Sequence, residues 1–188
     1  MALAATTKIM AKQGLRGLST RRIAARMGYS PGTLYQLFED LDDLILQVNA
    51  ATLDGLTEAC KDVDFSAGPE AALQDLANRY IAYVSRNAEL WNCVFEHRLP
   101  VGHEAPPWFG ERTQKLLGFG EKAIEPLFGP QEEKLRQHEA RVLWASLYGI
   151  AALATAKKLP NNESPQEMVR SLIRNFITGL QSTRTTAE

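Results

Sequence analysis

The sequence predicts an all-α protein with a small N-terminal helix-turn-helix domain and a larger C-terminal helical domain. Apolar residues recur at helical spacing along most of the 188 residues, and the alternating pattern of a β-strand is absent. Glycine and proline cluster at a few short breaks, which divide the chain into segments of helical length. We expect the two domains to comprise residues 1–45 and 46–188.

Capping signals predict two helices joined by a tight turn near the N-terminus. Ser19 can cap the first helix, and Gly28 can adopt the left-handed conformation that ends it. Ser30 and Pro31 can then begin the second helix, which leaves a turn of the length that a helix-turn-helix needs. Each helix has apolar residues for an inner face, namely Ile23, Ala24 and Met27 on the first and Leu34, Leu37 and Phe38 on the second.

The outward side of the second helix carries small or hydrogen-bonding side chains, which allow a helix to lie deep in a DNA major groove. Gln36 can pair with adenine there, and the methyl group of Thr33 can contact thymine. At the start of the first helix, free backbone N–H groups suit a phosphate. The expected DNA-binding residues are Ser19, Thr20, Arg21, Arg22, Ser30, Pro31, Gly32, Thr33, Tyr35 and Gln36.

The charge of the chain is distributed unevenly. Residues 1–38 contain six basic and no acidic side chains, so they carry +6, and because the whole chain carries −1 the remainder carries −7. A basic N-terminal segment on an acidic body is expected when only that segment contacts nucleic acid. Two short amphipathic helices without any DNA-binding role are the alternative, and the charge and the small outward side chains argue against it.

The N-terminal residues resemble the DNA-binding domain of TetR-family transcriptional regulators. The resemblance rests on Gly14, Leu18-Ser19-Thr20, Ile23-Ala24, Met27-Gly28-Tyr29-Ser30, Gly32-Thr33-Leu34-Tyr35 and Phe38, followed by a long helix at Leu44. It implies a homodimer in which three N-terminal helices bind a double-stranded DNA operator and a larger domain binds a small molecule that releases it. Residues 143–149 are similar to the Trp-His-Gly signature of one group of TetR-type C-terminal domains, with Tyr148 where that group often has His.

Leu41 departs from the family pattern. Family members usually carry a lysine there that reaches the phosphate backbone, whereas this chain has Leu41 among four acidic residues, Glu39, Asp40, Asp42 and Asp43. These acids can cap the next helix and interact with its dipole, or they can weaken DNA binding. We therefore expect modest operator affinity with a shallow salt dependence.

Further helices are expected at 41–60, 70–86, 88–98, 106–127, 132–158 and 166–182. The resemblance implies that the last two form a four-helix bundle across the dimer axis. The expected interface residues are Leu143, Leu147, Ile150, Ala154, Leu172, Ile173, Phe176 and Leu180. The alternative is that both apolar stripes pack within one subunit. A dimer is still expected, because one short recognition helix reads too few bases.

Aromatic residues gather in the sequence around the central helices, where an effector pocket is expected. An aromatic cavity with few polar groups would suit an apolar or aromatic small molecule. The expected ligand-binding residues are Tyr83, Trp91, Phe95, His97, Trp108, Phe109, Trp144 and Tyr148. The alternative is that these aromatics form ordinary core.

Other classes of protein find little support in the sequence. No apolar run of membrane-spanning length and no signal sequence is present, so a cytoplasmic protein with no membrane partner is expected. Cys60 and Cys93 have no metal-ligand spacing and are expected to be buried, reduced thiols, and neither a metal nor a cofactor is expected. No nucleotide-binding or hydrolase motif occurs, so we do not expect an enzyme. A helical small-molecule-binding protein of the same fold that has lost DNA binding is the competing interpretation.

Overall fold

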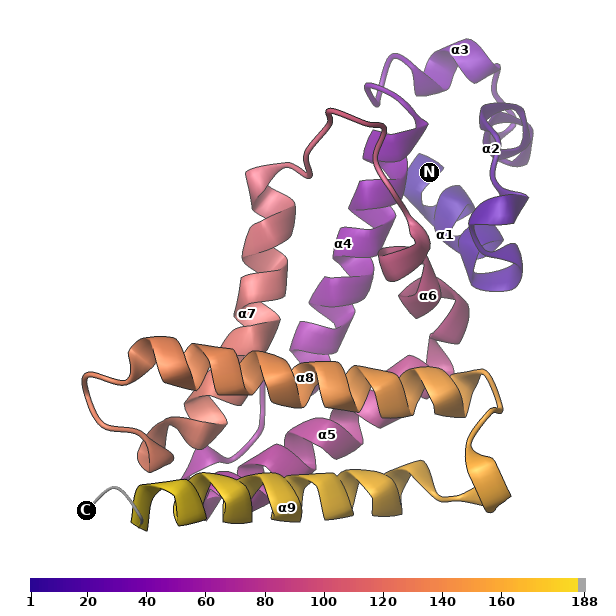
Figure 1. Cartoon of the computed structure of the whole chain (residues 1–188). Coiled ribbons are helices and arrows are strands. Elements are labelled where there is room, and N and C mark those ends of the chain that lie inside the picture. The colour runs from indigo at the N-terminus through magenta and orange to yellow at the C-terminus, as the bar shows by residue number, and fades with distance from the viewer. Residues whose placement is uncertain (186–188) are drawn as a thin grey trace. The chain divides into compact units, whose positions relative to one another are not determined.

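The computed structural model describes residues 1–185, which form helices and turns without a strand. The α-helices are α1 (Ala2–Gln13), α2 (Thr20–Met27), α3 (Pro31–Leu34), α4 (Leu41–Cys60), α5 (Pro69–Arg86), α6 (Ala88–Glu96), α7 (Pro107–Ile124), α8 (Glu133–Thr155) and α9 (Pro165–Thr185) (Figure 1). The all-α prediction is confirmed, and the helices predicted beyond residue 40 agree with α4 to α9 within three residues at each end.

The described chain divides into two compact units. The first contains Met1–Gly55 and Arg86–Thr113, and the second contains Leu56–Ser85 and the described residues from Gln114 onward. The first unit includes all of the expected domain 1–45, together with α6, which packs against α1. The expected division at residue 45 stays a prediction.

The helix-turn-helix is built on a shared apolar cluster and on the predicted caps. Its buried members are Ala2, Ala5, Ile9, Ile23, Ala24, Leu34 and Leu44. The Ser19 side chain accepts a hydrogen bond of 3.2 Å from the backbone N–H of Arg22, as an N-cap does. Gly28 ends α2 in the left-handed region, at φ 76° and ψ 26°, and the backbone N–H of Tyr29 donates to the carbonyl of Ala24. Local signals therefore place this motif.

The second helix of the motif is shorter than predicted. α3 ends at Leu34, whereas the sequence predicts a helix through Phe38 with Leu37 on its inner face. The prediction that Leu37 lies on the inner face is wrong, because its side chain is 61% exposed. The backbone N–H groups of Leu37 and Phe38 both donate to the Leu34 carbonyl at 3.0 Å, so the last turn tightens and Leu37 leaves the inner face. Phe38 still packs against the cluster.

α4 begins at a cap made by the acidic residues. The Asp40 carboxylate accepts a 2.8 Å hydrogen bond from the backbone N–H of Asp43, and the Asp43 carboxylate accepts one of 3.3 Å from the N–H of Glu39. Leu41 packs against the apolar cluster of the helix-turn-helix. Further along α4, the Asn49 side-chain amide donates to the Cys93 carbonyl of α6 at 3.3 Å. α4 is thus anchored to both the helix-turn-helix and α6 within the first unit.

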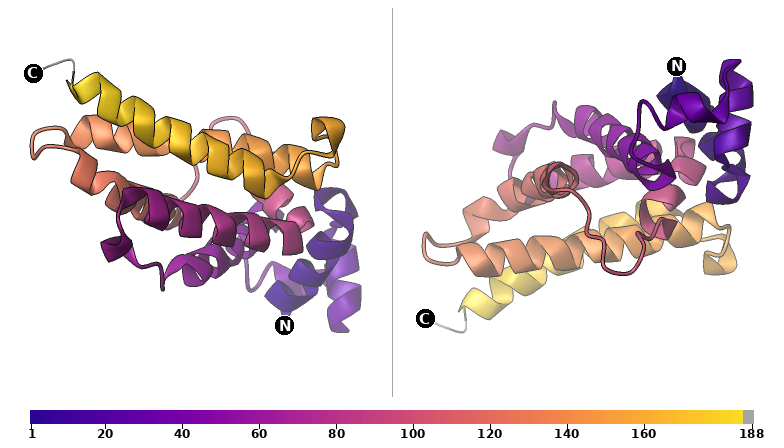
Figure 2. Two further views of the ribbon diagram at one scale, coloured as in Figure 1. Left: turned by 90° about the horizontal axis from the view of Figure 1, so that it is seen from below. Right: turned by 90° about the horizontal axis from the view of Figure 1, so that it is seen from above.

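The second unit contains two long helices that lie side by side. α8 and α9 pack against each other, as Figures 1 and 2 show. Their buried faces include Leu143 of α8 and Val169, Ile173 and Ile177 of α9. Along α5, the buried residues of this unit are Ala72, Leu73, Leu76, Ala77, Tyr80, Ile81 and Val84. The apolar stripes of α8 and α9 therefore contribute at least in part to the interior of the second unit itself.

Candidate nucleic-acid interface and ligand cavity

The helix-turn-helix presents the residues expected to bind DNA on its surface. Thr20 and Thr33 are half-buried, and the other expected residues, Ser19, Arg21, Arg22, Ser30, Pro31, Gly32, Tyr35 and Gln36, are exposed. All six basic side chains of residues 1–38 are also exposed. Cationic side chains on such a surface can contact phosphates, and exposed side chains of α3 and the following turn can reach base edges.

Three of these residues, Arg22, Ser30 and Thr33, also make hydrogen bonds within residues 17–33. The Arg22 guanidinium donates from Nη1 to the carbonyl of Gly17 at 3.1 Å, which ties α2 to the preceding turn. The Ser30 and Thr33 hydroxyl oxygens lie 3.4 Å apart, so either can donate to the other. Arg21, by contrast, makes no hydrogen bond or ion pair with the described residues. Of the two neighbouring arginines, Arg22 is held by the motif, and Arg21 is the one whose guanidinium stays available for a phosphate.

The acidic residues before and within α4 have structural partners. Asp40 and Asp43 form the cap, and the Gln47 side chain donates to Asp43 at 3.1 Å. His97 Nε2 lies 2.8 Å from Asp42 Oδ1, and the His97 side chain is only 7% exposed. Capping and pairing thus account for three of the four acids without any role in DNA binding. His97, expected to bind the ligand, is instead held against α4 within the first unit.

Exposed apolar side chains lie in the turns on either side of α3. Tyr29, Tyr35 and Leu37 are 52%, 58% and 61% exposed. Sequence reasoning missed Leu37 because it continued the helical period past the end of α3. Tyr35, the residue that follows α3, keeps a right-handed helical conformation, so the backbone does not turn sharply where the helix ends.

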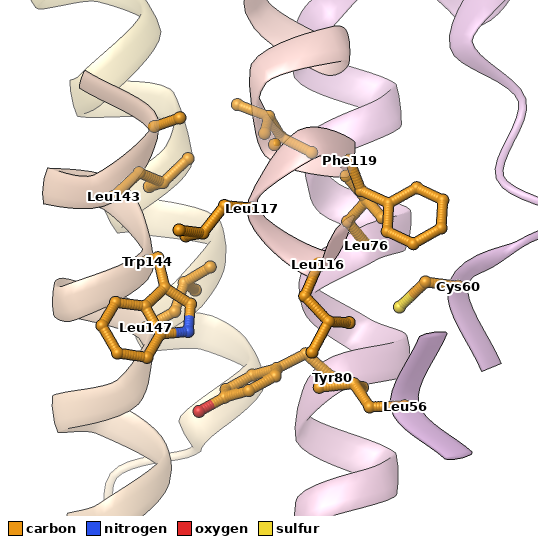
Figure 3. A pocket seen from close by; sticks show the side chains of 13 residues that line it. Leu56, Cys60, Leu76, Tyr80, Leu116, Leu117, Phe119, Leu143, Trp144 and Leu147 are labelled. Carbon is orange, nitrogen blue, oxygen red and sulfur yellow. The ribbon is translucent and has the colours of Figure 1, made fainter. Parts of the chain in front are cut away.

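A cavity opens in the second unit between α4, α5, α7 and α8 (Figure 3). It comprises about 620 Å³ of space free of atoms, including its open mouth. The lining residues are Leu56, Cys60, Leu73, Leu76, Tyr80, Leu116, Leu117, Phe119, Gly120, Ala140, Leu143, Trp144 and Leu147. Figure 3 shows Leu143, Trp144 and Leu147 on one side and Leu56 and Cys60 on the other. Most of the lining is aliphatic.

The eight residues expected to bind a ligand are divided between the two units. Trp144 lines the cavity, and its ring stacks on Tyr148 with centroids 5.9 Å apart. Tyr83 belongs to the same unit but is not among the lining residues. The other five belong to the first unit, and they are Trp91, Phe95, His97, Trp108 and Phe109. Arg112 covers the Trp108 ring at 5.3 Å and pairs with Asp54 of α4 at 3.1 Å. The leucines of the lining were missed because leucine at helical spacing is also the signature of an ordinary core.

The two thiols are poorly ionised. Burial raises the pKa of Cys60 and of Cys93 to about 11 in each case. Both thiols are free, and within residues 1–185 no group of His, Cys, Asp and Glu is arranged to hold a metal ion. None of the described helices combines the length and apolar character that a membrane span requires.

The expected dimer residues differ in their exposure. Leu143 and Ile173 are buried within the second unit, and Leu147, Ile150, Ala154, Leu172, Phe176 and Leu180 are half-buried. The large apolar side chains that α8 exposes are Leu135, Val142 and Leu153. Of the half-buried residues, Leu147 also lines the cavity, whereas Leu172, Phe176 and Leu180 belong to α9.

Two family models match the chain. The model described as bacterial regulatory proteins of the tetR family matches residues 2–48, which contain the helix-turn-helix. The model described as tetracyclin repressor-like, C-terminal domain, matches residues 73–176, more than half of the chain. A search of curated proteins by sequence gave no match.

Solved structures have the same fold at low sequence identity. A protein of unknown function from Rhodococcus sp. RHA1 is 22% identical with a TM-score of 0.76, over 95% of this chain and 92% of that one. BioQ, solved with its natural double-stranded DNA operator, is 16% identical with a TM-score of 0.69, over 96% of each chain. FadR from Bacillus subtilis, solved with stearoyl-CoA, is 12% identical with a TM-score of 0.72, over 95% of this chain and 97% of that one. With both family models matched along its length, the chain belongs to the TetR family of bacterial regulatory proteins.

Proposed function

We propose that this TetR-family regulator is a homodimer that binds a near-palindromic DNA operator as a repressor and is released by a small molecule. The observation that carries the proposal is the capped helix-turn-helix within residues 1–38, a segment whose six basic side chains are all exposed. BioQ, which has the same fold, was solved on its operator. We further propose that the protein acts in the cytoplasm and has no catalytic role.

In this proposal α3 and the turn after it, residues 31–38, form the α3 segment that reads bases in the major groove. The exposed Gln36 side chain can pair with adenine in a bidentate manner, and the half-buried Thr33 can present its methyl group to thymine. Arg21 would contact a phosphate, whereas Arg22 would act mainly by holding α2 on Gly17. Phosphate contacts would set the register, and the α3 segment would provide specificity.

A dimer is proposed because a single recognition segment covers too few bases. Two-fold symmetry would place the two segments in successive major grooves, with half-sites about 34 to 36 Å apart. α8 and α9 supply the proposed interface through the half-buried residues described above and the exposed Val142 and Leu153. Leu143 and Ile173 would support this surface from inside the subunit.

The proposed effector binds in the cavity of the second unit and is apolar or aromatic. Leu56 and Cys60 at the end of α4 line this cavity, and the beginning of the same helix packs in the first unit. A ligand that prefers one arrangement of α4 would shift the population of dimers between operator-binding and released forms. FadR, a structural relative, was solved with an apolar acyl chain attached to coenzyme A.

Selection from a random-sequence DNA pool tests the DNA-binding part of the proposal. We expect an inverted repeat to be enriched at near-physiological salt in the presence of non-specific competitor. Gln36→Ala should weaken binding to that sequence by about 1 to 3 kcal/mol and relax the base preference at one position of each half-site. Val101→Ala is a matched control, because Val101 is fully exposed outside the motif.

The second candidate is a helical small-molecule-binding protein of the same fold without operator binding. Leu41 favours it, because this residue packs against the apolar cluster at the position where the family resemblance implies a phosphate-binding lysine. A folded dimer that enriches no sequence would support this candidate and refute the proposed repressor.

A further inference from the structure

The cavity of the second unit is lined entirely by uncharged residues. Seven leucines, three aromatic residues, Cys60, Gly120 and Ala140 form its wall, with no Asp, Glu, Lys, Arg or His among them. Figure 3 shows Trp144 and the leucines of α8 facing Leu116 and Leu117 of α7 across the space. A ligand in this cavity would meet mainly hydrocarbon.

Cys60 adds no charge to the wall. Its side chain lies at the edge of the cavity, where Figure 3 labels it opposite Trp144. Burial raises the pKa of this thiol to about 11, so the thiol stays protonated at neutral pH. A thiol in that state cannot act as the counter-ion of a cationic ligand.

Two cations close to the lining are already held by other groups. Arg79 donates from Nε to Asp75 at 3.0 Å and from Nη1 to the Ala59 carbonyl at 3.0 Å. Lys122 places its ammonium group 4.4 Å from the centre of the Phe65 ring, which stacks on Phe119 of the lining at 6.4 Å. Both cationic side chains therefore interact with other groups of the protein, and neither is directed into the cavity.

We propose that the cavity selects an electrically neutral, lipophilic small molecule and rejects anions and cations of the same size and shape. An ionised group inside the cavity would lose its hydration and would find no opposite charge. The free-energy cost of that lost hydration outweighs the gain from the apolar contacts that the rest of the ligand makes. The inference rests on the proposed effector function, because it specifies the chemical class of ligand for that same site.

Two glycines of α7 provide a matched pair of variants. A Cβ atom added at Gly120 would lie 3.8 Å from the Ala140 Cβ, an ordinary contact, and a longer side chain there would extend along the cavity wall. A Cβ atom at Gly118, two residues earlier, meets nothing within 4 Å, and Gly118 does not line the cavity. Leucine is a better helix former than glycine at both positions, so the two variants differ mainly in the space they fill.

Titration calorimetry on the full chain without DNA tests the proposal. The probes are two matched sets, namely decanol, decanoate and decylammonium, and naphthylmethanol, naphthoate and naphthylmethylammonium. We expect at least one neutral probe to bind and its two charged partners to bind at least about tenfold more weakly. Gly118→Leu should retain this binding and Gly120→Leu should abolish it, with circular dichroism used to confirm that both variants are folded. Gly120→Ala, a smaller change, should weaken the binding without loss of fold.

Several results would overturn the proposal. The first is that a charged probe binds with the same affinity as its neutral counterpart. The second is that neither neutral probe binds to the protein. The third is that the Gly120→Leu variant binds a neutral probe as tightly as the parent protein does. Because DNA is absent from the assay, these failures are distinct from a failure of the proposed repressor. That function is tested separately, by adding the bound neutral probe to the protein–operator complex and measuring its release.

Discussion

Replacing Gly28 with alanine should destabilise the helix-turn-helix through backbone strain alone. Gly28 ends α2 at φ 76°, a region that alanine adopts at a cost of about 1 to 2 kcal/mol. The added methyl group would meet no atom within 4 Å, so no steric term adds to that cost. We therefore expect the free energy of unfolding to fall by about 1 to 2 kcal/mol, roughly a five- to thirtyfold change in the ratio of folded to unfolded protein.

Urea unfolding followed by far-ultraviolet circular dichroism measures this loss. Gly28→Asn should lose less stability, because asparagine tolerates the left-handed conformation better than alanine does. Gly118→Ala is the control, since Gly118 lies within α7 and should gain about 0.5 to 1 kcal/mol from the better helix former. If Gly28→Ala were as stable as the parent, or if Gly28→Asn were the less stable of the two, the strain argument would be refuted.

Three further predictions concern the interface and the cavity. Leu41→Lys should add one phosphate contact per subunit and steepen the salt dependence of operator binding by about 0.9 for each contact, measured by fluorescence anisotropy; an unchanged slope would show that position 41 does not reach the backbone. Asp40→Ala should remove the N-cap of α4 and lower the free energy of unfolding, measured in urea, by about 0.5 to 2 kcal/mol. Tighter DNA binding without loss of stability would contradict the capping role. Cys60 should be alkylated by iodoacetamide with a pH midpoint near 11 in the folded protein, against 9.0 for an ordinary thiol, and mass spectrometry of its peptide gives the rate. Since its pKa is raised on folding, the protonated thiol contributes stability that is complete below pH 9.0 and is lost as the pH rises through about 11; a midpoint near 9.0 would argue against a buried thiol at the cavity wall.

The fold could be predicted from the sequence because its signals are local. Ser19, Gly28 and Asp40 each act on backbone groups within five residues of themselves, and the structure confirms all three caps. Helical spacing of apolar residues similarly placed α4 to α9 within three residues. Where the local signal was ambiguous, as at the end of α3, the prediction for Leu37 was wrong.

The lining of the cavity could be predicted from the sequence only in part. Trp144 was expected there and lines the cavity, but Leu56, Leu76 and Leu116 carry no sequence mark that separates a cavity wall from a packed core. His97 had the chemistry of a ligand-binding group, yet it pairs with Asp42, a residue 55 positions away in the chain. Such long-range pairs depend on how helices pack, and no spacing in the sequence reports them.

The sequence by itself determined the helical class, the position of the helix-turn-helix and the basic charge of residues 1–38, because caps, periodicity and charge are properties of neighbouring residues. Only the tertiary structure decided which apolar stripes face inward and where space is left between them. Leu143 and Ile173 are buried within the second unit, and the cavity is lined by residues of α4, α5, α7 and α8 that lie between Leu56 and Leu147 in the chain. The physical reason is that burial and empty volume result from the packing of whole helices, to which each residue contributes only a part.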